Sequence, residues 1–212
     1  ERMAVAQVLL VRAIVAALAA ALLDEQLHVW GTTLHDRFML PYALWEDFEA
    51  VLRFLAKRGL PLDATWYRPF VDYRFPLSGA IERNGVRVEI RPALEPWPVL
   101  GEEPVGGGVS RYVDSSVERI EVRVIGDEAR RYALGVNGYE IGTEPTAVDG
   151  VRVAGLRFRA WQPPRCLQPH IGVHHPLRID LVDTETARSV AGCAVHVWHP
   201  DGRALDLPPL TA

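Results

Sequence analysis

Apolar residues recur with two different periods along this chain of 212 residues. Residues 3–23 are almost entirely alanine, leucine and valine with no Gly or Pro, which predicts one long helix. Residues 42–57 place apolar side chains at three- and four-residue steps, which predicts an amphipathic helix that ends at Gly59, before Pro61. Beyond residue 60 the helical period gives way to that of strands.

Short alternating segments predict strands over the remainder of the chain. Two Asn-Gly pairs, at 84–85 and 137–138, predict tight hairpin turns. The segment 92–110 contains four prolines and the triplet Gly106–Gly108, which predicts a long irregular loop. The expected strands are 70–75, 79–82, 86–91, 117–125, 132–136, 151–161, 177–182 and 190–198.

This order of elements predicts an α+β protein with two N-terminal helices packed beside an antiparallel β-sandwich. We expect a helical segment with a buried junction at 1–60 and a β-sandwich-like domain at 61–212. The junction, Trp30–Phe48, mixes aromatic residues with His35, Asp36 and Arg37. We interpret Asp36 and Arg37 as a local ion pair or helix cap rather than as acid–base groups, so the junction is expected to serve architecture.

Charge and cysteine content limit the partners and the cellular compartment that we expect for the protein. The net charge of -4 gives no electrostatic reason to expect a nucleic-acid partner. The two cysteines, Cys166 and Cys193, fit a reducing compartment, so we expect a cytoplasmic location, although one bridge between them is an alternative. Because the chain begins at Glu1 without an initiator methionine, we expect it to be part of a longer product.

The predicted helix at 3–23 is also long enough to span a bilayer or to form part of a signal peptide. Arg12 near its middle and Gln7 argue against a span, because an arginine at the bilayer centre costs about 2.5–3.5 kcal/mol. We therefore expect neighbouring chain to cover this helix, either the upstream part of the parent protein or a second copy in a homodimer.

Charged residues gather around the Gly-rich segment. Acidic and basic side chains that converge there could hold Mg²⁺ and phosphates, although charged strand faces are more often simply solvated. The weak catalytic candidates are Glu89, Arg91, Glu95, Glu102, Arg111 and Asp114.

Histidines and cysteines supply the other candidate chemistry. Pairing of 177–182 with 190–198 would bring His174 and His175 opposite 196–198, which makes His174 and His196 weak metal-ligand candidates. Neighbouring strand residues alternate faces, so a surface or structural role is the favoured interpretation. Of the cysteines, Cys193 resembles a small core residue, while Cys166 lies in a loop and is the more exposed nucleophile candidate.

Several longer motifs together resemble a known family. They are Trp30–Pro41, Ala93–Glu103, Arg111–Arg119, Arg159–Pro164 and Ile171–His174. They resemble the C-terminal portion of a bacterial domain of unknown function found fused to transglutaminase-like proteins. That family has been proposed to contain amidoligases related to the glutamine-synthetase-like carboxylate-amine ligases. The resemblance covers essentially the whole chain.

The resemblance implies a role beside an ATP-dependent ligase core. The motifs associated with that core have no counterpart in this sequence, so no catalytic residue is transferred, and the implied ATP and Mg²⁺ would bind mostly upstream. We expect an accessory part that recognises a peptide-like substrate. The alternatives are a non-catalytic binding module that uses Arg157, Arg159 and Trp161, and a histidine-based metal site. Convergence of Glu89, Glu95, Glu102 and Arg111 in one cleft would favour an active-site contribution.

Overall fold

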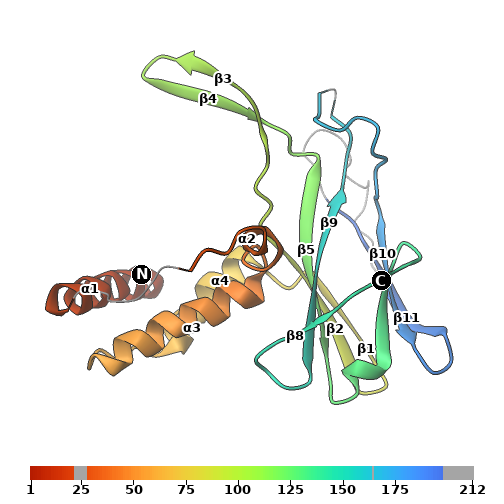
Figure 1. Ribbon diagram of the computed structural model, residues 1–212, viewed down its shortest axis with the longest axis horizontal. Helices are drawn as coiled ribbons and strands as arrows, with labels where there is room; N and C mark the ends of the chain where they lie inside the picture. The colour runs from red at the N-terminus through yellow and green to blue at the C-terminus, as the bar shows by residue number, and fades with distance from the viewer. Residues whose placement is uncertain (22–27, 164, 198–212) are drawn as a thin grey trace. The chain divides into compact units, whose positions relative to one another are not determined.

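The computed structural model describes residues 1–21, 28–163 and 165–197. The chain divides into two compact units, a helical unit at Glu1–Leu77 and a β-rich unit at Ser78–Ala212 (Figure 1). This confirms the α+β class expected from the sequence. The division lies later than residue 60 because the helical segment at Arg68–Arg74 still belongs to the first unit.

Small residues let the two long helices of the first unit approach each other. Helix α1 (Arg2–Ala20) buries Ala6, Ala13 and Ala17, and these alanines belong to the same apolar clusters as Leu52 and Leu55 of α3 (Pro41–Lys57). Pro41 occupies the first turn of α3, where its missing N–H costs nothing. The other helical segments are α2 (Thr33–Asp36), η1 (Ala64–Trp66) and α4 (Arg68–Arg74).

The rest of α1 exposes apolar side chains. Val5, Val8, Val11 and Val15 are each more than half exposed. By length and mean hydropathy, 2.2 over its most apolar stretch, α1 could cross a membrane, but signal sequences and core helices have the same properties. That the upstream part of the parent protein or a second copy of the chain covers these side chains of α1 stays a prediction.

The strand expected at 70–75 is wrong, because the chain forms α4 there. Pro69 suits the first turn of a helix, and Arg68 pairs with Asp72 one turn later, with Nε and Oδ1 3.4 Å apart. The ring of Phe70 also stacks on that of Tyr67, 6.3 Å away. Apolar residues over so short a segment fit a strand and a helix equally well, and packing within the helical unit decides between them.

Two antiparallel sheets form most of the second unit. The five-stranded sheet has the order β1-β2-β5-β9-β8, and the four-stranded sheet has the order β11-β10-β6-β7. Both Asn-Gly turns are confirmed, with positive φ at Asn84, Gly85, Asn137 and Gly138. The strands are β1 (Gly79–Arg83), β2 (Val86–Pro92), β5 (Val117–Ile125), β6 (Tyr132–Val136), β7 (Tyr139–Ile141), β8 (Glu144–Pro145), β9 (Val151–Arg159), β10 (Leu177–Asp183) and β11 (Arg188–Val195), with η2 (Ala129–Arg131) before β6.

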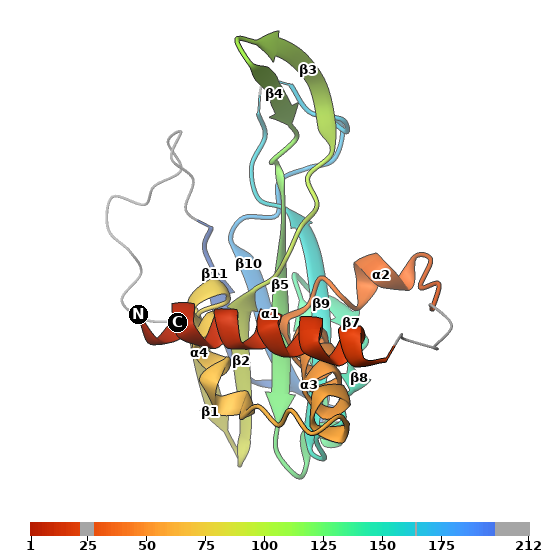
Figure 2. The same ribbon diagram turned by 90° about the vertical axis from the view of Figure 1, so that its left-hand side faces the viewer.

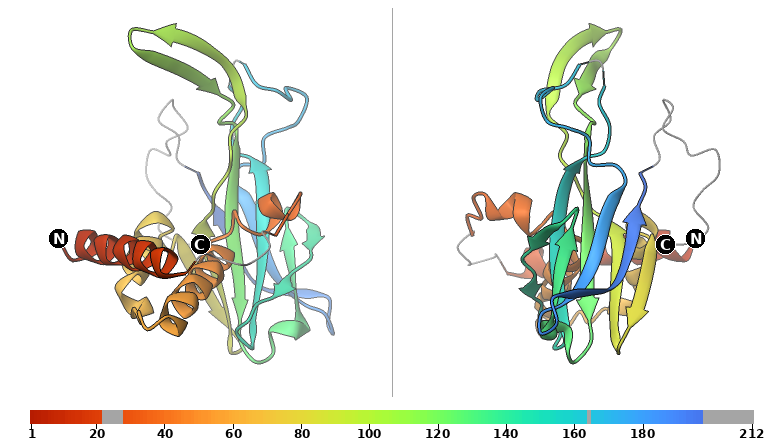
Figure 3. Two further views of the ribbon diagram at one scale, coloured as in Figure 1. Left: turned by 60° about the vertical axis from the view of Figure 1, so that its left-hand side comes forward. Right: turned by 90° about the vertical axis from the view of Figure 1, so that its right-hand side faces the viewer.

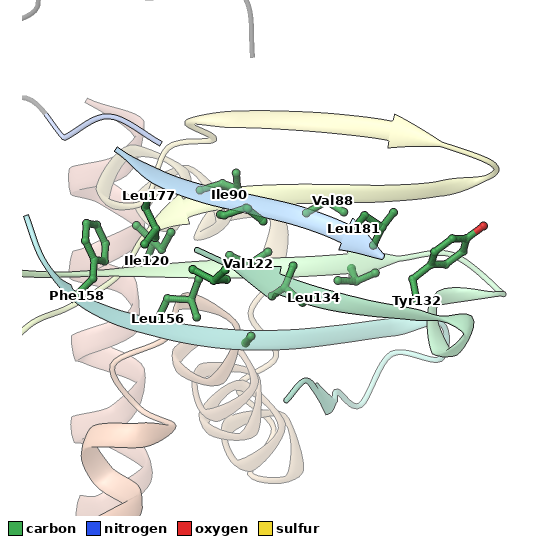
Figure 4. Close-up of a cluster of buried hydrophobic side chains, with 14 of the residues drawn as sticks. Val88, Ile90, Ile120, Val122, Tyr132, Leu134, Leu156, Phe158, Leu177 and Leu181 are labelled. Carbon is green, nitrogen blue, oxygen red and sulfur yellow. The ribbon is translucent and has the colours of Figure 1, made fainter. Parts of the chain in front are cut away.

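One apolar core lies between these two sheets (Figure 4). Every second residue of β2, β5 and β9 faces β6 and β10, as the alternation in the sequence predicts. The most deeply buried members include Val122, Leu134, Ile179 and Leu181. The opposite face of β2, β5 and β9 is therefore the one that carries charged side chains.

The irregular loop expected at 92–110 is only partly correct. Strands β3 (Val99–Val105) and β4 (Gly108–Val113) form a two-stranded hairpin that projects beyond the end of β5 (Figures 2 and 3). Gly107, with φ of 87°, supplies the turn conformation that other residues adopt only with strain. Glycine and proline thus mark a hairpin tip and a strand edge here rather than an unstructured loop.

Candidate functional site

The charged face of the five-stranded sheet is a network of ion pairs. Arg119 on β5 lies directly opposite Arg157 on β9, an arrangement of like charges that would repel. Glu95, from the segment after β2, lies against both arginines. Its carboxylate oxygens are 3.0 Å from Nε of Arg119 and 2.9 Å from Nε of Arg157. The side chain of Glu95 is only 4% exposed, so it holds two strands together from a buried position.

The other carboxylates on this face also pair with arginines. Glu89 lies 2.9 Å from Nε of Arg87 and 3.9 Å from Nε of Arg91. Glu121, which is fully buried, accepts a hydrogen bond from Arg123. In such charge-assisted pairs the arginine nitrogens engage the carboxylate oxygens, which are therefore not open to a metal ion.

Glu118 on β5 was not predicted as a site residue, yet the pKa of its carboxyl group is strongly shifted. Burial, followed by the negative charge of Glu95, raises the pKa of Glu118 to about 7. The alternation of β5 puts Glu118 on the same side of the strand as the core residues Ile120 and Val122, so the sequence carried a signal for the burial. The contribution of Glu95 comes from a residue distant in the sequence and could not be predicted.

Glu102 and Arg111 lie away from that face, on the hairpin. Arg111 Nε on β4 is 2.6 Å from a carboxylate oxygen of Glu102 on β3, and both side chains are exposed. On the other face of the hairpin the Tyr112 hydroxyl donates to Glu103 over 2.9 Å. Glu89, Glu95, Glu102 and Arg111 are thus divided between a sheet face and a projecting hairpin.

Asp114 lies at the base of the hairpin and is buried. Its carboxylate accepts hydrogen bonds from the backbone N–H of Ser116 over 3.0 Å and of Leu167 over 2.9 Å. Burial alone would raise the pKa of Asp114, but the hydrogen bonds from Ser116 and Leu167, together with the charge of Arg159, lower it overall. Asp114 therefore ties the hairpin base to the loop that follows β9.

The structure pairs a different histidine with His196 than the predicted one. Leu177 faces Val195 in the register of β10 and β11, and the ring of His175 contacts that of His196 with centroids 5.4 Å apart. The backbone N–H of Val197 donates to Nε2 of His175, while His174 is exposed. His199 lies outside the described residues. Within the described ranges, no three His, Cys, Asp or Glu side chains gather as a metal site would require.

The alternative binding surface at 157–161 is occupied by internal contacts. Arg157 pairs with Glu95, and the indole N–H of Trp161 donates to the backbone oxygen of Ser115 over 2.8 Å. Arg159 is buried. In the junction, Arg37 pairs with Glu46 over 3.2 Å, which agrees with a structural role, while the side chain of Asp36 is outside the described part of the structure.

The hairpin has strand edges and apolar side chains to which a further strand could bind. Among the described residues, β3 and β4 pair only with each other, so each has an open edge. Its apolar side chains are largely exposed, including Val99, Val105, Val109 and Tyr112, each more than half exposed. Open strand edges beside exposed apolar side chains are what an added peptide strand requires.

The register shows which backbone groups face outward. Val105 and Gly108 close the two-residue turn, and in such hairpins the closing pair is hydrogen-bonded. Bonded and non-bonded pairs alternate along antiparallel strands. Pro104 and Val109 form the next pair, so their backbone groups point away from the partner strand.

The two edges of the hairpin consequently differ. On β3 the outward position at Pro104 has no N–H to offer, which blunts that edge. On β4 the outward positions are Val109 and Arg111, and both retain their N–H groups. The edge of β4 is therefore the better template for an extended peptide.

The structure thus defines an α+β protein whose β unit combines a sandwich-like core with a projecting hairpin. The chain matches over residues 1–212 the family described as "Putative amidoligase enzyme (DUF2126)", and it belongs to that family. In comparisons with curated proteins and with solved structures, no match to the chain was found.

Proposed function

We propose that this chain is the substrate-recognition part of an ATP-dependent amidoligase and that it binds a peptide-like substrate along β4. The observation that carries the proposal is the open edge of β4, where the outward N–H groups of Val109 and Arg111 lie beside exposed apolar side chains. A bound peptide would add a strand: its backbone would bond to β4, and its side chains would contact those of Val109 and Val113. Membership of the amidoligase family supports a substrate with carboxylate and amine groups.

Substitution of Val109 by proline tests this edge. Because its N–H points outward, Val109→Pro removes a bond to the peptide without removing one from the hairpin, and Pro104 already occupies the facing position. A peptide chosen from an array of random decapeptides should bind Val109→Pro about tenfold more weakly than the original chain, the upper end of the effect of losing one hydrogen bond. Fluorescence anisotropy of the labelled peptide measures the affinity.

Val109→Ile is the matched control, since it keeps the N–H and the β-branched shape. It should bind within about twofold of the original chain. Equal affinities for the proline and isoleucine variants, or an array on which no peptide binds, would show that β4 is not the recognition edge.

The proposal places ATP, Mg²⁺ and the ligation step on the upstream part of the parent chain. In its support, Glu89, Glu95 and Glu102 each lie within 3.0 Å of an arginine nitrogen. Mg²⁺ with its bound phosphates relies on carboxylate oxygens that are open to it.

We accordingly expect no ATP turnover by the isolated chain when ATP, Mg²⁺, a primary amine and a carboxylate are supplied together. Release of ADP or inorganic phosphate is the measurement, and the longer parent protein is the positive control. Turnover by the isolated chain above the buffer rate would place the catalytic centre within these residues. If the parent protein also shows no turnover, the chain is a non-catalytic binding module.

A further inference from the structure

A buried guanidinium at the end of β9 has an unusual partner. Arg159 is 3% exposed, and its Nη1 donates a hydrogen bond to Sγ of Cys166 over 3.2 Å. Its Nε is buried without a hydrogen-bond acceptor. Among the described residues, no carboxylate oxygen lies within 4.0 Å of this guanidinium. A charge removed from water in this way needs a compensating negative charge.

Asp114 supplies only part of that compensation. Its charge acts on Arg159 from beyond ion-pair distance, while its oxygens are already engaged by the backbone of Ser116 and Leu167. The atom in direct contact with the guanidinium is the sulfur of Cys166. The negative charge that develops on this sulfur when Cys166 reacts would lie next to Arg159.

The loop around Cys166 is fixed on both sides of the sulfur. The amide nitrogen of Gln162 lies 3.6 Å from Sγ as a second donor and also donates to the backbone oxygen of Pro169 over 3.1 Å. On the other side, the N–H of Leu167 is bound by Asp114. The sulfur thus accepts from two donors, which favour negative charge as it develops on the sulfur during a reaction, and Cys166 itself is partly exposed to reagents.

We propose that Cys166 is a reactive thiol, whose sulfur accepts hydrogen bonds from Arg159 and Gln162, and that it is a site of modification by small disulfides. In this reaction the thiolate attacks one sulfur of the disulfide. A new bond forms between Sγ and that sulfur, the original S–S bond breaks, and the second sulfur leaves as a thiolate that takes up a proton from water. Modification adds a group to the sulfur beside Arg159, next to the loop tied to Asp114.

Cys193 provides an internal comparison. It lies on β11, where burial and then the charge of Asp180 raise the pKa of the Cys193 thiol. No arginine contact is present among its described neighbours, so it is the thiol that stays protonated and unreactive. The chain therefore offers one thiol of each kind in the same fold.

Rates of exchange with dithiodipyridine test the proposal. In the Cys193→Ser chain only Cys166 can react, and in Cys166→Ser only Cys193. At neutral pH we expect folded Cys166 to react about tenfold faster than the same residue in the urea-unfolded chain, and folded Cys193 more slowly than its unfolded form. Glutathione measured in both buffers corrects for the effect of urea on the reagent.

Replacement of Arg159 tests whether its guanidinium is the cause of the fast reaction of Cys166. Arg159→Met in the Cys193→Ser background should lower the rate of Cys166 to about that of the unfolded chain, with circular dichroism confirming the fold. If that variant does not fold, Gln162→Ala removes the exposed second donor and should lower the rate about twofold to threefold. Folded Cys166 that reacts no faster than unfolded Cys166 would overturn the proposal, whatever the variants do.

Discussion

Glu95→Ala should lower the free energy of unfolding of the β unit by about 3 kcal/mol, the lower end of the cost of breaking a buried ion pair. The carboxylate lies between Arg119 and Arg157, which face each other across β5 and β9. Without it, two like charges meet directly and the buried guanidinium of Arg119 loses the oxygen 3.0 Å from its Nε. Arg157 is about half exposed and regains water, which limits the loss.

Glu102→Ala is the matched control because it removes a shorter ion pair from an exposed place. Glu102 and Arg111 are 2.6 Å apart, but their side chains are 49% and 66% exposed. Solvent weakens such pairs, so the loss should stay below about 1 kcal/mol. Urea unfolding followed by circular dichroism gives both values, provided that the m-value is unchanged. Equal losses in the two variants would contradict a special role for burial at Glu95.

The stability of the β unit should fall as pH rises from about 4.5 to 7 because of Glu118. Its pKa in the folded protein is about 7, above the ordinary value of 4.5. Below the lower value both states hold the proton, and between the two values only the folded state does. The folded state is thus favoured at the acidic end, and this advantage disappears as Glu118 ionises.

Glu118→Gln should remove this slope and leave the protein about 1–2 kcal/mol more stable than the original at pH 8. The figure is below the full value of the shift, since partial exposure screens the charge. Stability measured at several pH values in both proteins gives the difference, in which the titration of histidines cancels. Glu128→Gln, which changes an exposed carboxylate on the same unit, should leave the slope in place. A wild-type profile that is flat or rises over this window would contradict the assignment to Glu118.

The two predictions are linked through Glu95. Its charge is the second cause, after burial, of the raised pKa of Glu118. Glu95→Ala should therefore bring the pKa of Glu118 part of the way back, and the slope of stability against pH should become shallower in that variant. The effects of Glu95→Ala and Glu118→Gln on the free energy of unfolding should accordingly be non-additive when both are made in one chain.

The sequence by itself determined the parts of the fold that have strong local signals. The alternation in Val117–Ile125 predicted β5 with its observed bounds, and the Asn-Gly pairs at 84–85 and 137–138 predicted two turns that have positive φ at each residue. The long apolar helix and the amphipathic helix were also predicted within a few residues of α1 and α3. These features depend on neighbours in the chain, so one sequence carries them.

Only the tertiary structure decided α4, the β3–β4 hairpin and the partners of the charged residues. The helix at Arg68–Arg74 depends on packing of rings in the helical unit, and the hairpin uses glycine and proline in ways that also fit a loop. Glu95 pairs with Arg157, and the charge of Arg159 acts on Asp114, between strands and loops far apart in sequence. Charge and burial act through space, so the sequence could name these residues as candidates, whereas their partners, and with them their chemistry, came from the fold.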